Sequence, residues 1–224
     1  MKKLVLILLL FTLLFTGCST NKKNTNKSSL AFKESYESLN GKTNKNGKQH
    51  RILNIDSNNP FEEISAKELL EKLKNKETFY VYFGDKLCPW CRSVIEKAVE
   101  IANNKNIDKI YYVAIWDDDG NEILRDKYEF NESEIVKISD GSEEYQEFLK
   151  YFDSVLSDYT LNDKEGNKID VGEKRIYAPN FIYVKEGKAI RLTEGISDKQ
   201  KDSREELTEE ILKDEEELFE EFFK

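Results

Sequence analysis

The sequence predicts an α/β fold in which helices flank a central mixed sheet. Three observations predict it. A buried strand, a helix and a second buried strand follow one another over 78–116, two strands joined by a tight turn follow over 175–193, and an amphipathic helix closes the chain. A strand-helix-strand order with short links favours a right-handed parallel crossover, whereas a tight turn joins antiparallel strands. The sheet is therefore expected to be mixed.

The first residues predict export. Lys2 and Lys3 precede an apolar run over 4–15, which is short for a membrane-spanning helix and typical of a signal peptide. The run ends in L-F-T-G and Cys18, which resembles the bacterial lipoprotein box, where the cysteine is acylated and becomes the new N-terminus. We expect a signal peptide at 1–17 and a lipid on Cys18. The alternative is an ordinary signal peptide with an incidental cysteine.

Composition and charge divide the rest of the chain. Residues 19–29 contain no apolar side chain, which predicts flexible chain. Residues 19–57 carry eight Lys and Arg against three acids, and 58–224 carry 25 against 41. A basic segment beside a lipid suits an anionic membrane surface, and the acidic remainder argues against nucleic acid as a partner. We expect a lipidated flexible tether and entry segment over 18–50, with an added edge strand over 50–55, and one domain over 51–224.

The elements of the domain follow in order. Ser65 and Glu68 fit a capping box, so a helix is expected over 65–75. Residues 78–83 are nearly all aromatic or β-branched, as in a strand buried on both faces, and Gly84 ends them. Pro89 fits the first turn of a helix with an apolar stripe. A second buried strand is expected over 110–116.

The second half of the chain is more polar. Residues 120–162 read as mainly helical, with a clear amphipathic helix carrying Tyr145, Phe148 and Phe152. A hairpin is expected over 160–171, and strands over 175–184 and 189–193 form a second hairpin. A final acidic helix is expected from about residue 204, capped by Ser203, and its inward-facing residues are expected to be Leu207, Ile211, Leu218 and Phe222.

Two cysteines carry the candidate chemistry. The chain has three cysteines, and if Cys18 bears a lipid, only Cys88 and Cys91 remain. Cys88 stands at a helix N-terminus, where the helix dipole and unpaired backbone amides stabilise a thiolate, the form that attacks disulfides. Cys91 lies one turn later on the apolar face and is shielded. We therefore expect Cys88 to attack and Cys91 to resolve the mixed disulfide.

The element order, together with Cys88-Pro-Trp-Cys91 and the pair Ala178-Pro179 about ninety residues later, resembles the thioredoxin fold, a three-layer sandwich. The resemblance implies an enlarged insertion over 120–177 and a cis Pro179 beside the cysteines. It also implies that Ala178 offers its backbone to an incoming peptide. Pro89 is expected to restrict the turn, and Trp90 either presents an apolar face to a partner or merely covers Cys91.

One position departs from the resemblance. Thioredoxins often bury an acid six residues before the first cysteine, as the proton acceptor for the second, and here Tyr82 stands there. Tyrosine is a poor base at neutral pH. Either Asp85, Lys86 or water then relays the proton, or the mixed disulfide resolves slowly. Arg92 is expected to be solvated.

Other site classes have weaker support. Zinc normally takes four protein ligands in a structural site, and the chain offers the two thiols and a single histidine, His50. A Ser-His-Asp or Cys-His enzyme would depend on the same histidine. No metal or cofactor is therefore expected beyond the redox-active cysteine pair.

The sequence predicts a lipid-anchored thiol-disulfide oxidoreductase on the outer face of the bacterial cytoplasmic membrane. Its expected partners are exported proteins with disulfides or thiols, and a membrane protein that exchanges electrons with it. The alternative is a non-catalytic thioredoxin-like module with a static disulfide, similar to accessory proteins of bacteriocin export.

Overall fold

The fold is described by a computed structural model for residues 27–131 and 133–224. The expected signal peptide and Cys18 lie outside these residues. None of the helices in the described ranges has the length and apolar composition needed to cross a membrane.

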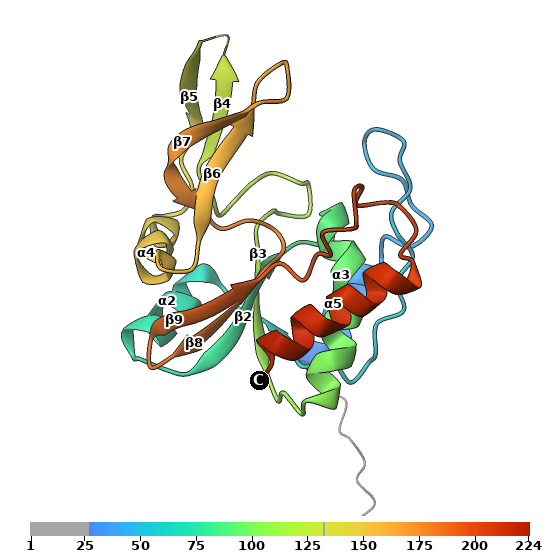
Figure 1. The fold of residues 1–224 in the computed structure, drawn as a ribbon. Helices are drawn as coiled ribbons and strands as arrows, with labels where there is room; N and C mark the ends of the chain where they lie inside the picture. Colours follow the sequence, from blue (N-terminus) through green and yellow to red (C-terminus); the bar gives the residue numbers. More distant parts are fainter. Residues whose placement is uncertain (1–26, 132) are drawn as a thin grey trace, which may run out of the picture.

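A five-stranded mixed sheet forms the centre of the structure (Figure 1). Its strands, in spatial order, are β1 (Phe61–Glu63), β3 (Ile110–Ala114), β2 (Phe79–Gly84), β8 (Asn180–Lys185) and β9 (Lys188–Thr193). Strands β1 and β2 run parallel to β3, whereas β8 is antiparallel to β2 and to β9. The expected parallel crossover from β2 to β3 and the hairpin of β8 and β9 are both confirmed.

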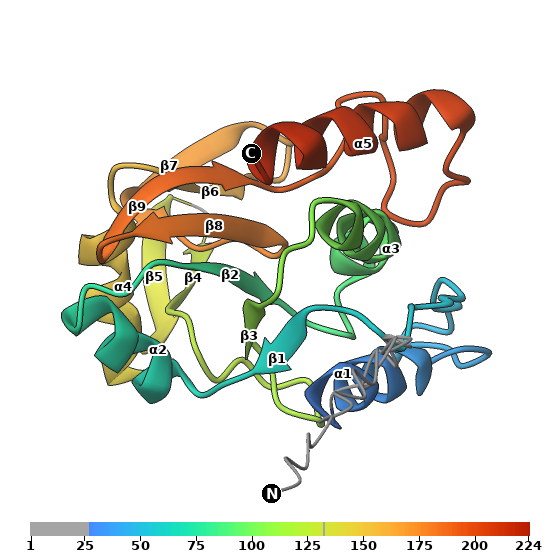
Figure 2. The same ribbon diagram turned by 90° about the horizontal axis from the view of Figure 1, so that it is seen from below.

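Helices cover both faces of this sheet (Figure 2). On one face lie α2 (Ala66–Lys74) and α4 (Glu143–Phe152), and on the other lie α1 (Lys27–Glu37), α3 (Pro89–Asn104) and α5 (Glu209–Phe222). Side chains of β2 alternate between the layers, as strand geometry requires: Val81 and Phe83 pack with α2 and α4, and Tyr82 packs with α1, α3 and α5. The prediction of a mixed sheet flanked by helices is confirmed.

The region before β8 differs from the expectation of mainly helical structure. Residues 127–139 form a hairpin of β4 (Lys127–Asn131) and β5 (Glu134–Ser139), in which exposed residues alternate with half-buried Tyr128 and Phe130. The expected later hairpin is present as β6 (Ser157–Asn162) and β7 (Lys168–Arg175). Figure 1 shows both hairpins projecting from the same end of the molecule.

Residues 27–29, expected to be flexible chain, instead open helix α1, which continues through the expected entry segment to Glu37. Helix α1 buries Phe32 and Tyr36 against the sheet, because these two side chains lie one turn apart on the same helix face. Ser29 donates to the Asn59 carbonyl at 2.5 Å, and the Asn59 amide donates back to the Ser29 carbonyl. Residues 50–55 do not form the expected edge strand, whose place is taken by β1.

The last helix starts later than expected. Thr208, rather than Ser203, caps α5 by accepting a hydrogen bond from the Ile211 amide. Leu218, expected to face inward, is 38% exposed. The buried positions are Ile211, Glu215, Phe219 and Phe222, which follow the 3.6-residue period of a helix.

Candidate active site

Cys88 is positioned by the junction between β2 and α3. It is the N-cap residue of α3, with an extended backbone, and Pro89 opens the first turn as expected. The Cys91 amide donates a hydrogen bond to the Cys88 sulfur at 3.3 Å. The first turn contains no acidic side chain, so nothing in it opposes negative charge on this sulfur.

The two thiols are free, and their surroundings differ. A hydrogen bond from Cys91, assisted by the backbone amides of Cys91 and Trp90 and by the charge of Arg125, lowers the pKa of the Cys88 thiol, although its burial acts in the opposite direction. Burial raises the pKa of the fully buried Cys91 thiol, and its hydrogen bond to Cys88 raises it further. Negative charge is therefore favoured on the outer sulfur of the pair.

Ala178 and Pro179 lie beside this sulfur. The peptide bond between them is cis, and the Cys88 thiol donates to the Ala178 carbonyl oxygen at 3.4 Å. The predicted approach of two features ninety residues apart is thus present. Trp90 is half-buried and packs against the core beside the cysteines, while Cys88 itself is only 4% exposed. The Cys88 sulfur is more covered than we expected.

Tyr82 lies beneath the pair. Its hydroxyl is 2.9 Å from the hydroxyl of Tyr36, and its side chain packs in the same buried cluster as Cys91. Hydrogen bonding from Tyr82 acts to lower the pKa of the Cys91 thiol, against the larger effect of burial. Burial raises the pKa of Tyr82 well above its usual value, and the neighbouring Cys91 raises it further. The phenol therefore keeps its proton and acts as a hydrogen-bond donor.

Asp85 and Lys86 were expected as possible proton carriers. Burial raises the pKa of Asp85 to about 6, against the lowering effect of hydrogen bonds from the amides of Leu87 and Trp116. Hydrogen bonding from the Asp85 backbone amide also acts to lower the pKa of the Cys91 thiol. Lys86 instead pairs with the exposed Asp118 at 2.7 Å.

Two arginines near the site were missed or misjudged from the sequence. Arg92, expected to be solvated, is 1% exposed, and it donates to the carbonyls of Tyr36, Arg51 and Lys86. Helical spacing from Ile95 and Val99 could have placed Arg92 on the buried face. Arg125 is also buried and donates to the Ile176 carbonyl at 3.0 Å. No local pattern in the sequence marks its approach to Cys88.

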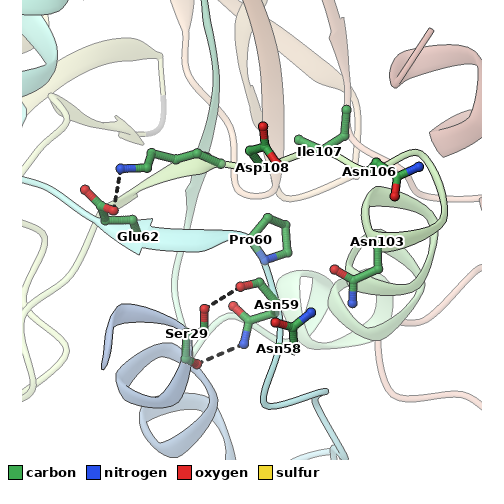
Figure 3. Close-up of a pocket in the computed structure, with 10 residues that line it drawn as sticks. Ser29, Asn58, Asn59, Pro60, Glu62, Asn103, Asn106, Ile107 and Asp108 are labelled. Carbon is green, nitrogen blue, oxygen red and sulfur yellow. Dashed lines mark hydrogen bonds and ion pairs between the residues drawn. The ribbon is translucent and has the colours of Figure 1, made fainter. Parts of the chain in front are cut away.

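A polar hollow lies at the opposite end of α3 (Figure 3). It has a volume of about 310 Å³, and Asn103 of the last turn of α3 contributes to its wall. With 16 residues, α3 is about 24 Å long, which separates this hollow from Cys88. Asn59 uses its polar atoms to hold Ser29, Asp56 and the Phe61 amide, so it braces α1 against β1.

Within residues 27–131 and 133–224, no group of three or more His, Cys, Asp or Glu side chains is arranged to hold a metal ion. A scan against protein-family models finds no matching family, and a search of curated proteins finds no match.

Proposed function

We propose that the protein is a thiol-disulfide oxidoreductase with a thioredoxin-like fold. The strand order and the position of the cysteine pair after β2 support the fold assignment. The observation that carries the function is the placement of the Cys88 sulfur, which caps α3 and contacts the carbonyl before the cis Pro179. A pair that only locked the fold would need neither the lowered pKa of Cys88 nor this neighbour.

The reaction follows from the difference between the two sulfurs. The Cys88 thiolate attacks one sulfur of a substrate disulfide, forms a mixed disulfide and releases the other substrate sulfur as a thiolate. Cys91 then attacks the Cys88 sulfur, which forms the Cys88–Cys91 disulfide and releases the second substrate sulfur. The substrate gains two electrons, the pair loses two, and the protons of the two protein thiols end on the substrate sulfurs. The same steps in reverse oxidise a dithiol.

Because Cys88 is covered, the residues around it take part in the approach of the substrate. An approaching disulfide displaces the contact between the Cys88 thiol and the Ala178 carbonyl, and the freed backbone then binds the substrate chain. Trp90 and Pro179 form the apolar sides of this approach. Because the binding group is a backbone carbonyl, an extended peptide segment of little sequence specificity fits best.

The proposed location of the protein and its proposed partners rest on the N-terminal sequence around Cys18. A lipid on Cys18 places the domain on the outer face of the cytoplasmic membrane, where exported proteins carry disulfides. Continued turnover requires an electron partner, which we propose to be a membrane protein. The reactive disulfide is the only redox group that the reaction needs.

Insulin reduction with dithiothreitol tests the proposal. The full chain is expected to accelerate insulin precipitation, Cys88→Ser is expected to abolish the acceleration, and Cys18→Ser serves as the control that keeps it. A wild-type chain no faster than dithiothreitol alone would overturn the proposal in favour of a binding module with a static pair. A redox titration against glutathione then gives the direction, because a potential near that of thioredoxin indicates a reductase.

A further inference from the structure

The ring of Tyr82 is held in one orientation by its neighbours. It stacks on Phe181 with ring centroids 4.4 Å apart and on Tyr112 at 5.5 Å, and Phe61 meets it edge-on at 5.6 Å. Gly84 leaves the space that the phenol occupies, since a Cβ at residue 84 would lie 2.1 Å from the Tyr82 hydroxyl. The hydroxyl is thus fixed rather than free to turn toward solvent.

The fixed hydroxyl belongs to a buried chain of polar groups. Tyr36 lies 2.9 Å from it, and Cys91 packs with both tyrosines in one buried cluster. The Cys91 backbone amide in turn donates to the Cys88 sulfur at 3.3 Å. Tyr36, Tyr82 and Cys91 are each 0% exposed, so solvent does not replace these contacts.

We propose that Tyr82, supported by Tyr36, positions and stabilises the thiolate of the resolving Cys91 by hydrogen bonding, in place of an acidic proton acceptor. This inference rests on the proposed thiol-disulfide exchange. It makes Tyr82 and Tyr36 positioning residues, because neither touches the substrate.

The direction of the hydrogen bonds follows from the number of protons. A phenol has one proton to donate. When Tyr82 donates it to the Cys91 sulfur, Tyr36 must donate to the Tyr82 oxygen, and hydrogen bonds in such chains strengthen one another. Hydrogen bonding from the Asp85 backbone amide acts in the same direction, because it too lowers the pKa of the Cys91 thiol. Two donors aimed at a buried sulfur favour its anion, which is the form that attacks Cys88 in the mixed disulfide.

The exchange needs no carboxylate to retain a proton. In the second step Cys91 loses its proton, its sulfur forms the bond to Cys88, and the proton ends on the substrate sulfur that leaves. Tyr82 keeps its own proton throughout, in agreement with its raised pKa. The tyrosine therefore lowers the free energy of the thiolate without acting as a base.

The chain of donors begins in helix α1. Arg92 of α3 donates to the Tyr36 carbonyl at 2.7 Å, which fixes the end of α1 beside the first turns of α3. Phe32, one turn earlier, stacks on Phe61 at 4.4 Å. Helix α1, which precedes every strand of the sheet, is by this inference a working part of the redox centre.

Stopped-flow reaction of the reduced full chain with dithiobis(nitrobenzoate) separates the two steps. In chains that also carry Cys18→Ser, a first coloured thiolate reports attack by Cys88 and a second reports resolution by Cys91. Tyr82→Phe removes a hydrogen bond to the Cys91 anion, so the pH midpoint of the second phase is expected to shift upward. The second phase is also expected to slow by about three- to tenfold. The loss of rate is limited because the more basic Cys91 thiolate is also a stronger nucleophile. Tyr36→Phe is expected to slow it by less, about twofold.

Tyr80→Phe is the matched control, because Tyr80 lies on the same strand and face, two residues earlier, and contacts Arg191 instead of the cysteines. It is expected to change neither phase. A second phase with the same rate and pH midpoint in wild type and Tyr82→Phe would overturn the inference. If Tyr82→Phe unfolds, as judged by its thermal transition, an unchanged pH midpoint in Tyr36→Phe overturns it instead. Failure of the proposed function is distinct, because the first phase would then be no faster than that of an unstructured thiol.

Discussion

Glu215 predicts a pH dependence of the free energy of unfolding whose size can be calculated. It lies on α5, is 0% exposed, and neither of its carboxylate oxygens has a hydrogen-bond partner within the described residues. Burial raises the pKa of Glu215 from 4.5 to about 8, although the positive charges of Arg51 and Lys97 act in the opposite direction. The fold therefore favours the protonated carboxyl.

The sign and size of the pH dependence follow by linkage. Because the folded pKa is higher than the unfolded one, the stabilisation is fully present below pH 4.5 and is lost as pH rises through about 8. Each pKa unit corresponds to about 1.4 kcal/mol. The glutamine in Glu215→Gln is neutral at every pH. The free energy of unfolding of this variant minus that of wild type is therefore expected to rise by about 1.4 kcal/mol per pH unit over this range, about 5 kcal/mol in all.

Urea denaturation of reduced protein at several values between pH 5 and pH 9 measures this difference. Glu216→Gln is the control, since the neighbouring Glu216 is half exposed and lies 3.8 Å from Lys97 at the surface. The buried glutamine amide changes the free energy of unfolding by the same amount at every pH. The test is therefore how the difference between the variant and wild type changes with pH. Parallel curves for wild type and Glu215→Gln would refute the buried, unpaired carboxyl.

Three further predictions concern groups around the sulfurs. Gly84→Ala is expected to lower the free energy of unfolding by about 1–3 kcal/mol in urea, because its Cβ would collide with Tyr82, and an unchanged midpoint would contradict this packing. Arg92→Lys is expected to lower the free energy of unfolding by about 2–4 kcal/mol in the same assay, because an ammonium group cannot donate to all the carbonyls that the guanidinium binds. A decrease below about 0.5 kcal/mol would show that these guanidinium contacts are dispensable. Arg125→Gln removes a positive charge and is expected to raise the pKa of the Cys88 thiol and slow its alkylation by iodoacetamide at neutral pH, and an identical pH-rate profile would show that the charge is too distant to matter.

The parts of the fold that were predictable are those with a strong period or a strong boundary signal. The all-apolar β2 and the capping box of α2 are of this kind. Strands β4 and β5 have no clear sequence signal, because they are rich in charged residues and contain only a few half-buried aromatic and aliphatic ones. The two strands are held by pairing with each other rather than by burial. Helix α1 was missed because its polar composition outweighed the two buried aromatic side chains, Phe32 and Tyr36.

The candidate site divides in the same way. The cysteine spacing and the Ala178-Pro179 pair are local signals, and the resemblance they support placed them together correctly. The contact of Tyr36 with Tyr82 joins residues 46 positions apart, and no periodicity or motif encodes such a distance. Long-range side-chain contacts of this kind depend on how the layers pack, which the sequence of a single chain does not display.

Arg125 gives the region before β8 a chemical connection to the cysteines. The guanidinium forms an ion pair with Glu122 and donates to the carbonyl of Ile176, two residues before Ala178. The same group contributes to the lowered pKa of Cys88. A movement of the region that shifts Arg125 would therefore change both the charge near the Cys88 sulfur and the backbone that precedes the cis proline. Because both effects act through one buried side chain, substitution of Arg125 tests whether this region adjusts the reactivity of the pair or only lies beside it.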